Sequence, residues 1–324
     1  MRKAMGCLSV IAILAAGVLS TFDRAAADTW PERTVRVIVT TGAGAGSDVA
    51  ARLFADRLAA RWKRPVIVEN RPGADGLIGT AAFTTLRDDH ALLFSIAAPI
   101  TILPLTHDKL PYDPAHDLVP ISAATETFGT VAVAASLKIG SLRQFVARAR
   151  SEPGKFNYYG GAGALPFTFA GFVRQQGLDM VRVSYREFNL GMQDLVQGRL
   201  HVMASTMTGF LPAVQAEKVH FLAVTNSTRA PIAPAVPTVI EAGYPELAFD
   251  GLAGFFGPRG ISIERLHGIS EDIRAAAADP VLSDRLIAAG QRVHAGTPTE
   301  FSAALEKQRE KMAAIANLVG GKPQ

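Results

Sequence analysis

The stretch VIVTTGAGAGSDVAARLFADRL, residues 37–58, begins with a short apolar run. A glycine-rich segment follows, and then a segment with helical spacing of its apolar residues. The apolar run predicts a buried strand, and Val49, Leu53, Phe54 and Leu58 recur on one face of the segment after it. Glycines permit the tight turn that such a strand-to-helix connection needs. This stretch constrains the fold most, because a strand, a turn and a helix in this order begin an α/β structure.

Strand and helix signals continue to alternate after this unit. Apolar or β-branched runs predict further strands at 65–69 and 91–96, with helical spacing between them. A proline-rich connection at 110–120 interrupts the rhythm. Strand signals then return at 131–134, 155–159, 181–185, 201–204 and 221–225. Strands separated by helices predict parallel sheets with right-handed crossovers, and therefore two α/β units.

The last part of the chain holds one strand signal, at 252–256, followed by helical segments. One strand cannot form a sheet by itself, so we expect this tail to pack against the first unit. The chain then crosses between two lobes twice and leaves a ligand cleft between them. The prediction is a first lobe from 28–127 and 250–324 and a second from 128–249, each a mostly parallel sheet with helices on both faces.

Residues 1–27 differ in composition from the rest. Two basic residues come first, an apolar stretch follows from Cys7 to Leu19, and three alanines end at Ala27. This order is typical of a secretory signal peptide, so we predict export to the periplasm with cleavage near Ala27. Cys7 is the only cysteine, and an exported chain without it has no cysteine nucleophile, cysteine metal ligand or disulfide.

The charge of the chain excludes one class of partner. The formal net charge is +4 at pH 7 for all 324 residues, and basic and acidic residues alternate along the predicted helices. Nucleic-acid-binding proteins gather their basic residues on one face. We therefore predict no nucleic-acid partner.

The glycine-rich segment at Gly42, Gly44 and Gly46 has three interpretations. A dinucleotide-binding site needs G-x-G-x-x-G, but the position of the third glycine is Ser47 or Val49. A structural role is a tight turn, with Ser47 or Asp48 capping the helix. An anion site uses the backbone N–H groups and the positive dipole end at the start of the helix, which favour a carboxylate. The second and third interpretations are compatible.

An ordered series of motifs extends the pattern along the chain. It contains WPERTVR from Trp30, the glycine turn ending in Ser47-Asp48, VENRPGA from Val68, LPYDP from Leu110, PGKFNY from Pro153 and VPTVIEAG from Val236. The series resembles the substrate-binding receptors of tripartite tricarboxylate transporters, the Bug or TctC-like family. The resemblance implies a two-lobed periplasmic binding protein that closes on a small mono- or dicarboxylate, aromatic acids included, and delivers it to membrane permease subunits. We expect a monomer without cofactor or metal.

The resemblance also places the ligand site. In the first lobe it falls on Thr40, Thr41, Gly42, Gly44, Gly46, Ser47 and Asp48 of the turn, and on Ala97 and Ala98. In the second lobe it falls on Gly161, Gly163, Ala164 and Thr168, with Tyr185, Arg186 and Ser205 nearby.

Several of these positions carry a hydroxyl or an imidazole in the family and are apolar here, for example Ala97 and Leu165. We therefore expect a ligand with one anchoring carboxylate and an apolar or aromatic body, since a buried polar ligand group without a partner costs about 1–3 kcal/mol. The alternative is that backbone groups recognise the ligand and that these side chains only shape the wall of the site. Arg186 is a candidate to bind a second carboxylate of the ligand, or to form an ion pair with Glu187. Tyr185 is a candidate to contact the ligand with its ring, or to pack against the core.

The sequence offers no catalytic constellation. There is no G-x-S-x-G elbow, and the histidines are scattered instead of paired with a nucleophile. Asp88-Asp89-His90 is expected to be a polar turn and not a metal site. We predict a receptor and not an enzyme. The alternatives are a secreted hydrolase that uses the same cleft, or a ligand-sensing partner of a sensor kinase.

Overall fold

The computed structural model describes residues 30–161, 163–185 and 188–319. The predicted signal peptide and Arg186 lie outside the described residues. Within the described ranges, no helix combines the length and the apolar character that crossing a membrane requires. The architecture below belongs to the compact unit that begins at Arg33.

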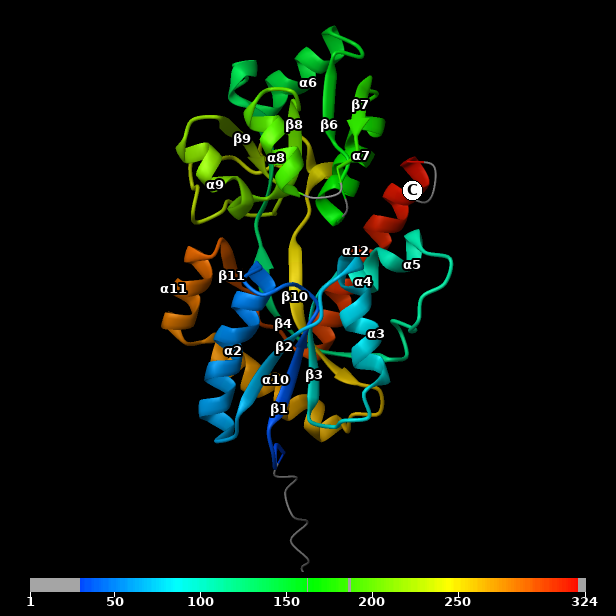
Figure 1. The fold of residues 1–324 in the computed structure, drawn as a ribbon, viewed down its shortest axis with the longest axis vertical. Coiled ribbons are helices and arrows are strands. Elements are labelled where there is room, and N and C mark those ends of the chain that lie inside the picture. Colours follow the sequence, from blue (N-terminus) through cyan, green and yellow to red (C-terminus); the bar gives the residue numbers. More distant parts are fainter. Residues whose placement is uncertain (1–29, 162, 186–187, 320–324) are drawn as a thin grey trace, which may run out of the picture. The chain divides into compact units, whose positions relative to one another are not determined.

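Two sheets organise this unit (Figure 1). The six-stranded sheet has the order β11-β4-β10-β3-β1-β2 and contains β1 (Val35–Val39), β2 (Val66–Asn70), β3 (Ala91–Ile96), β4 (Leu118–Thr127), β10 (Gly251–Pro258) and β11 (Gln291–Val293). The five-stranded sheet has the order β7-β6-β8-β5-β9 and contains β5 (Gly129–Ala134), β6 (Phe156–Tyr159), β7 (Met180–Val183), β8 (Val202–Thr206) and β9 (Val219–Val224). We call the first sheet with its helices lobe 1 and the second lobe 2.

Helices accompany both sheets, which confirms the predicted two-lobed α/β class. Lobe 1 has α2 (Gly46–Trp62), α3 (Leu77–Thr85), α4 (Ala98–Thr101), α5 (Leu103–Thr106), α10 (Ile263–Ala277), α11 (Pro280–Ala288) and α12 (Pro298–Val319). Lobe 2 has α6 (Leu142–Ser151), α7 (Ala164–Gln175), α8 (Phe188–Val196) and α9 (Met207–Gln215). Short 3-10 turns are η1 (Ala74–Gly76), η2 (Ala135–Leu137) and η3 (Pro245–Leu247).

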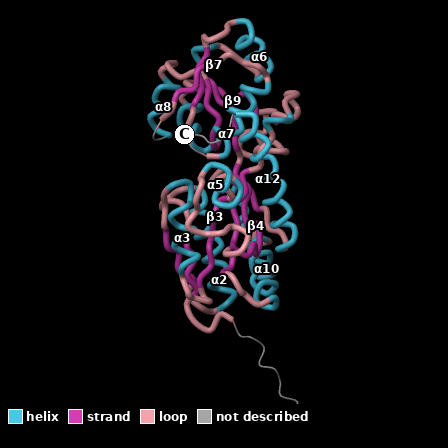
Figure 2. Tube along the Cα trace, turned by 90° about the vertical axis from the view of Figure 1, so that its right-hand side faces the viewer, coloured by secondary structure: helices cyan, strands magenta, loops and turns pink. Residues whose placement is uncertain are grey.

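Helices cover both faces of the lobe 1 sheet, as the layers in Figure 2 show. Successive residues of a strand point to opposite faces, and β10 illustrates the result. Phe255 packs edge-on against Phe54 of α2 and Phe94 of β3, with ring centroids 5.8 and 4.8 Å apart. On the other face, the ring of Phe256 lies 5.1 Å from that of Phe301 on α12. All five rings are fully buried.

Both sheets are mixed, whereas the prediction was mostly parallel sheets. β1 pairs in parallel with β2 and β3, but β10 runs antiparallel to β3 and β4. In lobe 2, β6 is parallel to its neighbours and β5 is antiparallel to β8 and β9. The reason is the connection between the sheets. β4 leads out of lobe 1 into β5 through Phe128, and β10 returns, so these two neighbouring strands run in opposite directions.

The sequence patterns missed β4 and β11. The sequence predicts a proline-rich connection up to Pro120, which includes the start of β4. That proline pairs with Phe256 where the register between β4 and β10 shifts, so the missing N–H falls at an irregularity of the ladder. β11 is too short to show periodicity. The lobe bounds at residues 127–128 and 249–250 stay a prediction.

Helix α12 packs on β4 of lobe 1 and also on α7 of lobe 2. The close approach to α7 depends on Gly171, because a Cβ there would lie 2.8 Å from Cγ2 of Ile315. Beside this contact, Phe167, Phe249 and Met312 belong to one buried apolar cluster. The two lobes are therefore joined by packed side chains as well as by strands.

Alanine at two helical glycines should change stability in opposite directions. Gly268 lies in α10 with nothing within 4 Å of an added Cβ, so Gly268→Ala should raise the free energy of unfolding by about 0.5–1 kcal/mol. Gly171→Ala should lower it, because overpacking against Ile315 costs about 1–3 kcal/mol. Urea denaturation measures both variants. Equal stabilisation by the two would contradict close packing between α7 and α12.

Candidate functional site

A cavity of about 300 Å³ is lined by residues of both lobes. Lobe 1 contributes the start of α2, with Gly46 and Ser47, and the end of β3. Lobe 2 contributes the start of α7 and the end of β8. Apolar side chains form much of the wall: Ile96, Leu165, Pro166, Phe249 and Leu252.

The described lining of the cavity carries almost no charge. Among the described residues that line the cavity, Asp75 is the single charged side chain, and none is lysine, arginine or histidine. The other polar groups are neutral hydroxyls and two carboxamides, those of Gln291 and Gln308. An anionic ligand would therefore have to be held here by neutral donors.

The start of α2 supplies such donors. The chain turns at Gly44, whose φ is 80°, a conformation that favours glycine. The N-cap residue is Ala45, and no side chain caps it. Within the described part of the chain, no group accepts a hydrogen bond from the N–H of Gly46 or Ser47. These N–H groups and the positive end of the helix dipole favour an anion.

The expected capping of α2 by Ser47 or Asp48 is wrong. Asp48 is buried and accepts hydrogen bonds from the Gly44 N–H at 2.8 Å, from Asn70 Nδ2 at 2.8 Å and from Arg52 Nε at 3.1 Å. Burial alone would raise its pKa, but the hydrogen bonds from Arg52, Gly44 and Asn70 together hold the pKa of Asp48 below its ordinary value. Asp48 thus fixes the turn that precedes the helix, because its carboxylate accepts from the backbone of that turn instead of from the first turn of α2.

Replacing Asp48 by asparagine should make stability less dependent on acid pH. A depressed folded-state pKa stabilises the fold above the unfolded pKa of about 3.9 and loses that contribution as the pH falls through the folded pKa. We expect Asp48→Asn to be less stable than the parent by about 1–3 kcal/mol at pH 7, since charged-group hydrogen bonds are lost. The difference should shrink between pH 5 and pH 3. Urea denaturation across this range tests it, and a constant difference would contradict the ion pair.

The structure brings part of the predicted site together. The members of the predicted site that line the cavity are Gly46, Ser47, Ala97, Ala98, Gly163, Ala164 and Ser205. The remaining described members lie outside the lining: Thr40, Thr41, Gly42, Gly44, Asp48, Gly161, Thr168 and Tyr185. The role of both groups in ligand binding stays a prediction.

Several of these outer residues have partners within the protein. The hydroxyl of Thr40 lies 3.2 Å from that of Ser95 and is buried. Thr168 donates to the carbonyl oxygen of Ala164 at 2.8 Å. Tyr185 donates to Asp194 at 2.8 Å, and its ring stacks on the ring of Tyr159.

Sequence reasoning missed lining residues from the tail of the chain. Gln291 is 1% exposed and donates from Nε2 to the carbonyl oxygen of Gly46 at 2.8 Å. Gln308 is 8% exposed and donates to the carbonyl oxygen of Asp250 at 3.1 Å. One signal was present, because Gln308 interrupts an otherwise apolar stripe of α12 that contains Phe301, Leu305, Met312 and Ile315.

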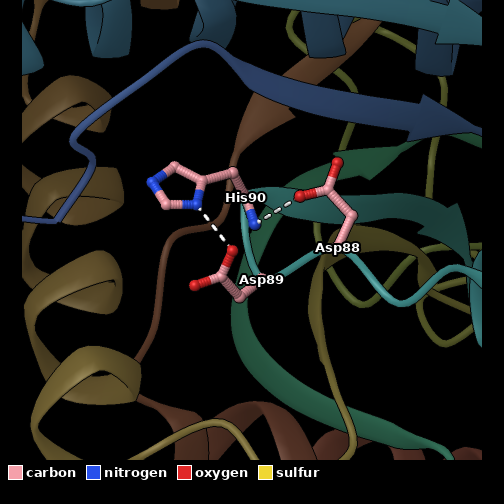
Figure 3. A group of neighbouring side chains, drawn as sticks. All are labelled: Asp88, Asp89 and His90. Atoms are coloured by element: carbon pink, nitrogen blue, oxygen red, sulfur yellow. Dashed lines mark hydrogen bonds and ion pairs between the residues drawn. The ribbon is translucent and has the colours of Figure 1, made fainter.

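Asp88, Asp89 and His90 form a compact group, with ligand-type atoms within 4.8 Å of one another (Figure 3). Their polar atoms already have partners. Arg33 donates to Asp88 at 2.8 Å and to Asp89 at 2.9 Å, and the ring Nδ1 of His90 lies 2.8 Å from Asp89. Because arginine charges neutralise both carboxylates, we assign the group to the ion-pair network of this turn.

Several known proteins are similar to this chain in sequence. Residues 50–320 match the family described as "Tripartite tricarboxylate transporter family receptor". A UPF0065 protein of Bordetella bronchiseptica is 29% identical over 300 residues, which are 92% of this chain and 89% of that protein. Protein BugT of Bordetella pertussis is 27% identical over 302 residues, 91% of this chain and 92% of the relative.

Solved structures share the fold. One described as a periplasmic transporter superposes with a TM-score of 0.78 at 26% identity, covering 90% of this chain and 99% of that chain. Rpa4515 of R. palustris, solved with adipate, gives a TM-score of 0.79 at 24% identity, covering 91% and 100%.

Proposed function

This chain belongs to the tripartite tricarboxylate transporter receptor family, and we propose that it captures a small organic carboxylate in the cavity between its lobes. Closure of the lobes follows from a higher affinity of the ligand for the closed state. The acid is then handed to the permease subunits of a tripartite transporter. We place the protein in the periplasm, after removal of the signal peptide near Ala27, and expect it to act as a monomer.

The observation that carries this proposal is the start of α2. Its N–H groups at Gly46 and Ser47 belong to residues that line the cavity, and no described group accepts from them. Such donors bind a carboxylate through hydrogen bonds and through the helix dipole, without a cationic side chain. This suits a receptor, since a ligand held by neutral groups can be released without breaking an ion pair.

The wall opposite favours a ligand with an apolar body. Leu165, Pro166 and Phe249 lie where the second lobe meets the cavity, and their side chains offer no hydrogen bond to a second or third carboxylate. An unpaired buried polar group costs about 1–3 kcal/mol. We therefore propose that citrate binds more weakly than a monocarboxylate with an aliphatic or aromatic body.

Titration calorimetry of the purified protein with citrate, adipate and benzoate tests the proposal. We expect binding of at least one of the acids with fewer carboxylates and weaker binding of citrate. Tight binding of citrate with none of benzoate would overturn the apolar-body part. Binding of no carboxylate, in these titrations or in native mass spectrometry of the protein as purified, would overturn the function itself.

The same samples distinguish a receptor from an enzyme. A receptor returns its ligand unchanged, so NMR spectra of the acid and of its methyl ester should show no turnover after prolonged incubation. Hydrolysis of the ester that scales with protein concentration would instead favour the hydrolase alternative.

A further inference from the structure

We propose that Asp75 makes this cavity selective for organic acids that also carry a protonated amine. The inference rests on the proposed function, because it takes the carboxylate of the ligand to lie at the start of α2. It adds a second recognition group, of opposite charge, for the rest of the ligand. The predicted class is zwitterionic acids, such as α- or ω-amino acids.

The first argument is the charge of the lining. Asp75 lies in η1 and lines the cavity together with Gly46 and Ser47. Within the described part of the chain, its carboxylate makes no hydrogen bond or ion pair with a protein group, although other acids of lobe 1, such as Asp48 and Asp88, have arginine partners. A ligand ammonium would supply the counter-charge that the described lining lacks.

The second argument is the surroundings of Asp75. Asp75 is an exposed residue, yet neighbouring protein atoms desolvate its carboxylate and raise its pKa above the ordinary value, with the charge of His107 opposing this. Asp75 in turn helps to raise the pKa of Tyr159 in lobe 2, after desolvation as the main cause. The charge of Asp75 thus acts on Tyr159, and a second anionic group of a ligand near Asp75 would be repelled.

The backbone also holds Asp75 in an unusual conformation. Its φ is 52° and that of Ala74 is 46°, both in the left-handed region, where residues other than glycine, asparagine and aspartate are rare. Asparagine tolerates this region as well as aspartate does. Asp75→Asn therefore removes the charge with little change to the turn.

Four acids with the same six-carbon chain test the proposal: hexanoate, adipate, norleucine and 6-aminohexanoate. They present a carboxylate with, respectively, a methyl end, a second carboxylate, an adjacent ammonium and a distant ammonium. We expect the parent protein to bind one of the two amino acids about tenfold or more tightly than hexanoate and adipate, as for a charge-assisted hydrogen bond. Calorimetry measures all four.

Asp75→Asn should remove this preference and improve the relative affinity for adipate. The matched control is Asp56→Asn, which changes the net charge equally at an exposed position of α2 outside the lining. Thermal unfolding of each variant checks that it is folded. Asp56→Asn should keep the preference of the parent protein.

The outcomes separate this inference from the proposed function. If adipate or hexanoate binds as tightly as the amino acids, or if Asp75→Asn keeps the preference, the role of Asp75 is overturned and carboxylate binding stands. If none of the four acids binds and the earlier titrations also fail, both are overturned.

Discussion

Replacing Gly46 by proline is expected to weaken carboxylate binding about tenfold to a hundredfold, because it removes one of the N–H donors at the start of α2. The substitution suits the helix. Gly46 is its first residue, where proline is favoured. Ala45 before it has φ −67° and ψ 156°, the extended conformation that a residue before proline prefers.

The matched control for this variant is Gly46→Ala. A Cβ at this position would lie 3.2 Å from Nε2 of Gln291, so both substitutions press on the same glutamine. Alanine keeps the N–H that proline lacks. We expect Gly46→Ala to bind the tightest acid of the calorimetric panel within about threefold of the parent, a change of well under 1 kcal/mol. Equal losses in the two variants would assign the effect to crowding and not to the donor.

Glu126→Ala is expected to lower the free energy of unfolding by about 2–4 kcal/mol, since it leaves the buried Asn226 and the partly exposed Arg292 without their acceptor. Glu126 is 1% exposed and lies at the end of β4, where the chain leaves lobe 1. Arg292 of β11 donates to it from two nitrogens, at 2.9 and 2.6 Å. Asn226, which follows β9, donates at 2.7 Å and also accepts from the Gly129 N–H.

An exposed pair with the same nitrogen–oxygen distances provides the control. Arg309 donates to Glu306 from two nitrogens, at 2.9 and 2.6 Å, but the two side chains are 54% and 50% exposed. Surface pairs contribute at most about 1 kcal/mol, so Glu306→Ala should change stability little. Chemical denaturation of both variants measures the contrast. Similar small losses would show that the Glu126 contacts do not hold the lobes together.

The regular elements of the fold were predictable because their patterns are local. The strand before Gly42 and the helix α2 follow from apolar spacing within one segment, although Val49 and Leu53 of the predicted apolar face are only partly buried. The tail contributes β10 and β11 to the six-stranded sheet, since a single strand must pair with an existing sheet. β4 could not be seen, because the tolerance of Pro120 depends on a register shift against β10, which is distant in sequence.

The candidate site was predictable in its backbone part and not in its side chains. The glycine turn predicts the start of α2. The resemblance to a family predicts Ala97 and Gly163 as residues of the same ligand site. Gln291 and Asp75 have no local signal, because their place in the cavity arises from packing between segments far apart in the chain. The side chains that distinguish one ligand from another belong to this group, whose positions depend on packing between distant segments.

A crystal structure of the protein with the acid that titrates most tightly tests the central claim most directly. The account predicts one carboxylate of the acid within hydrogen-bond distance of the Gly46 and Ser47 N–H groups, about 2.7–3.2 Å from nitrogen to oxygen, with both lobes in contact with the ligand. An acid bound elsewhere, with no anion at the start of α2, would contradict it.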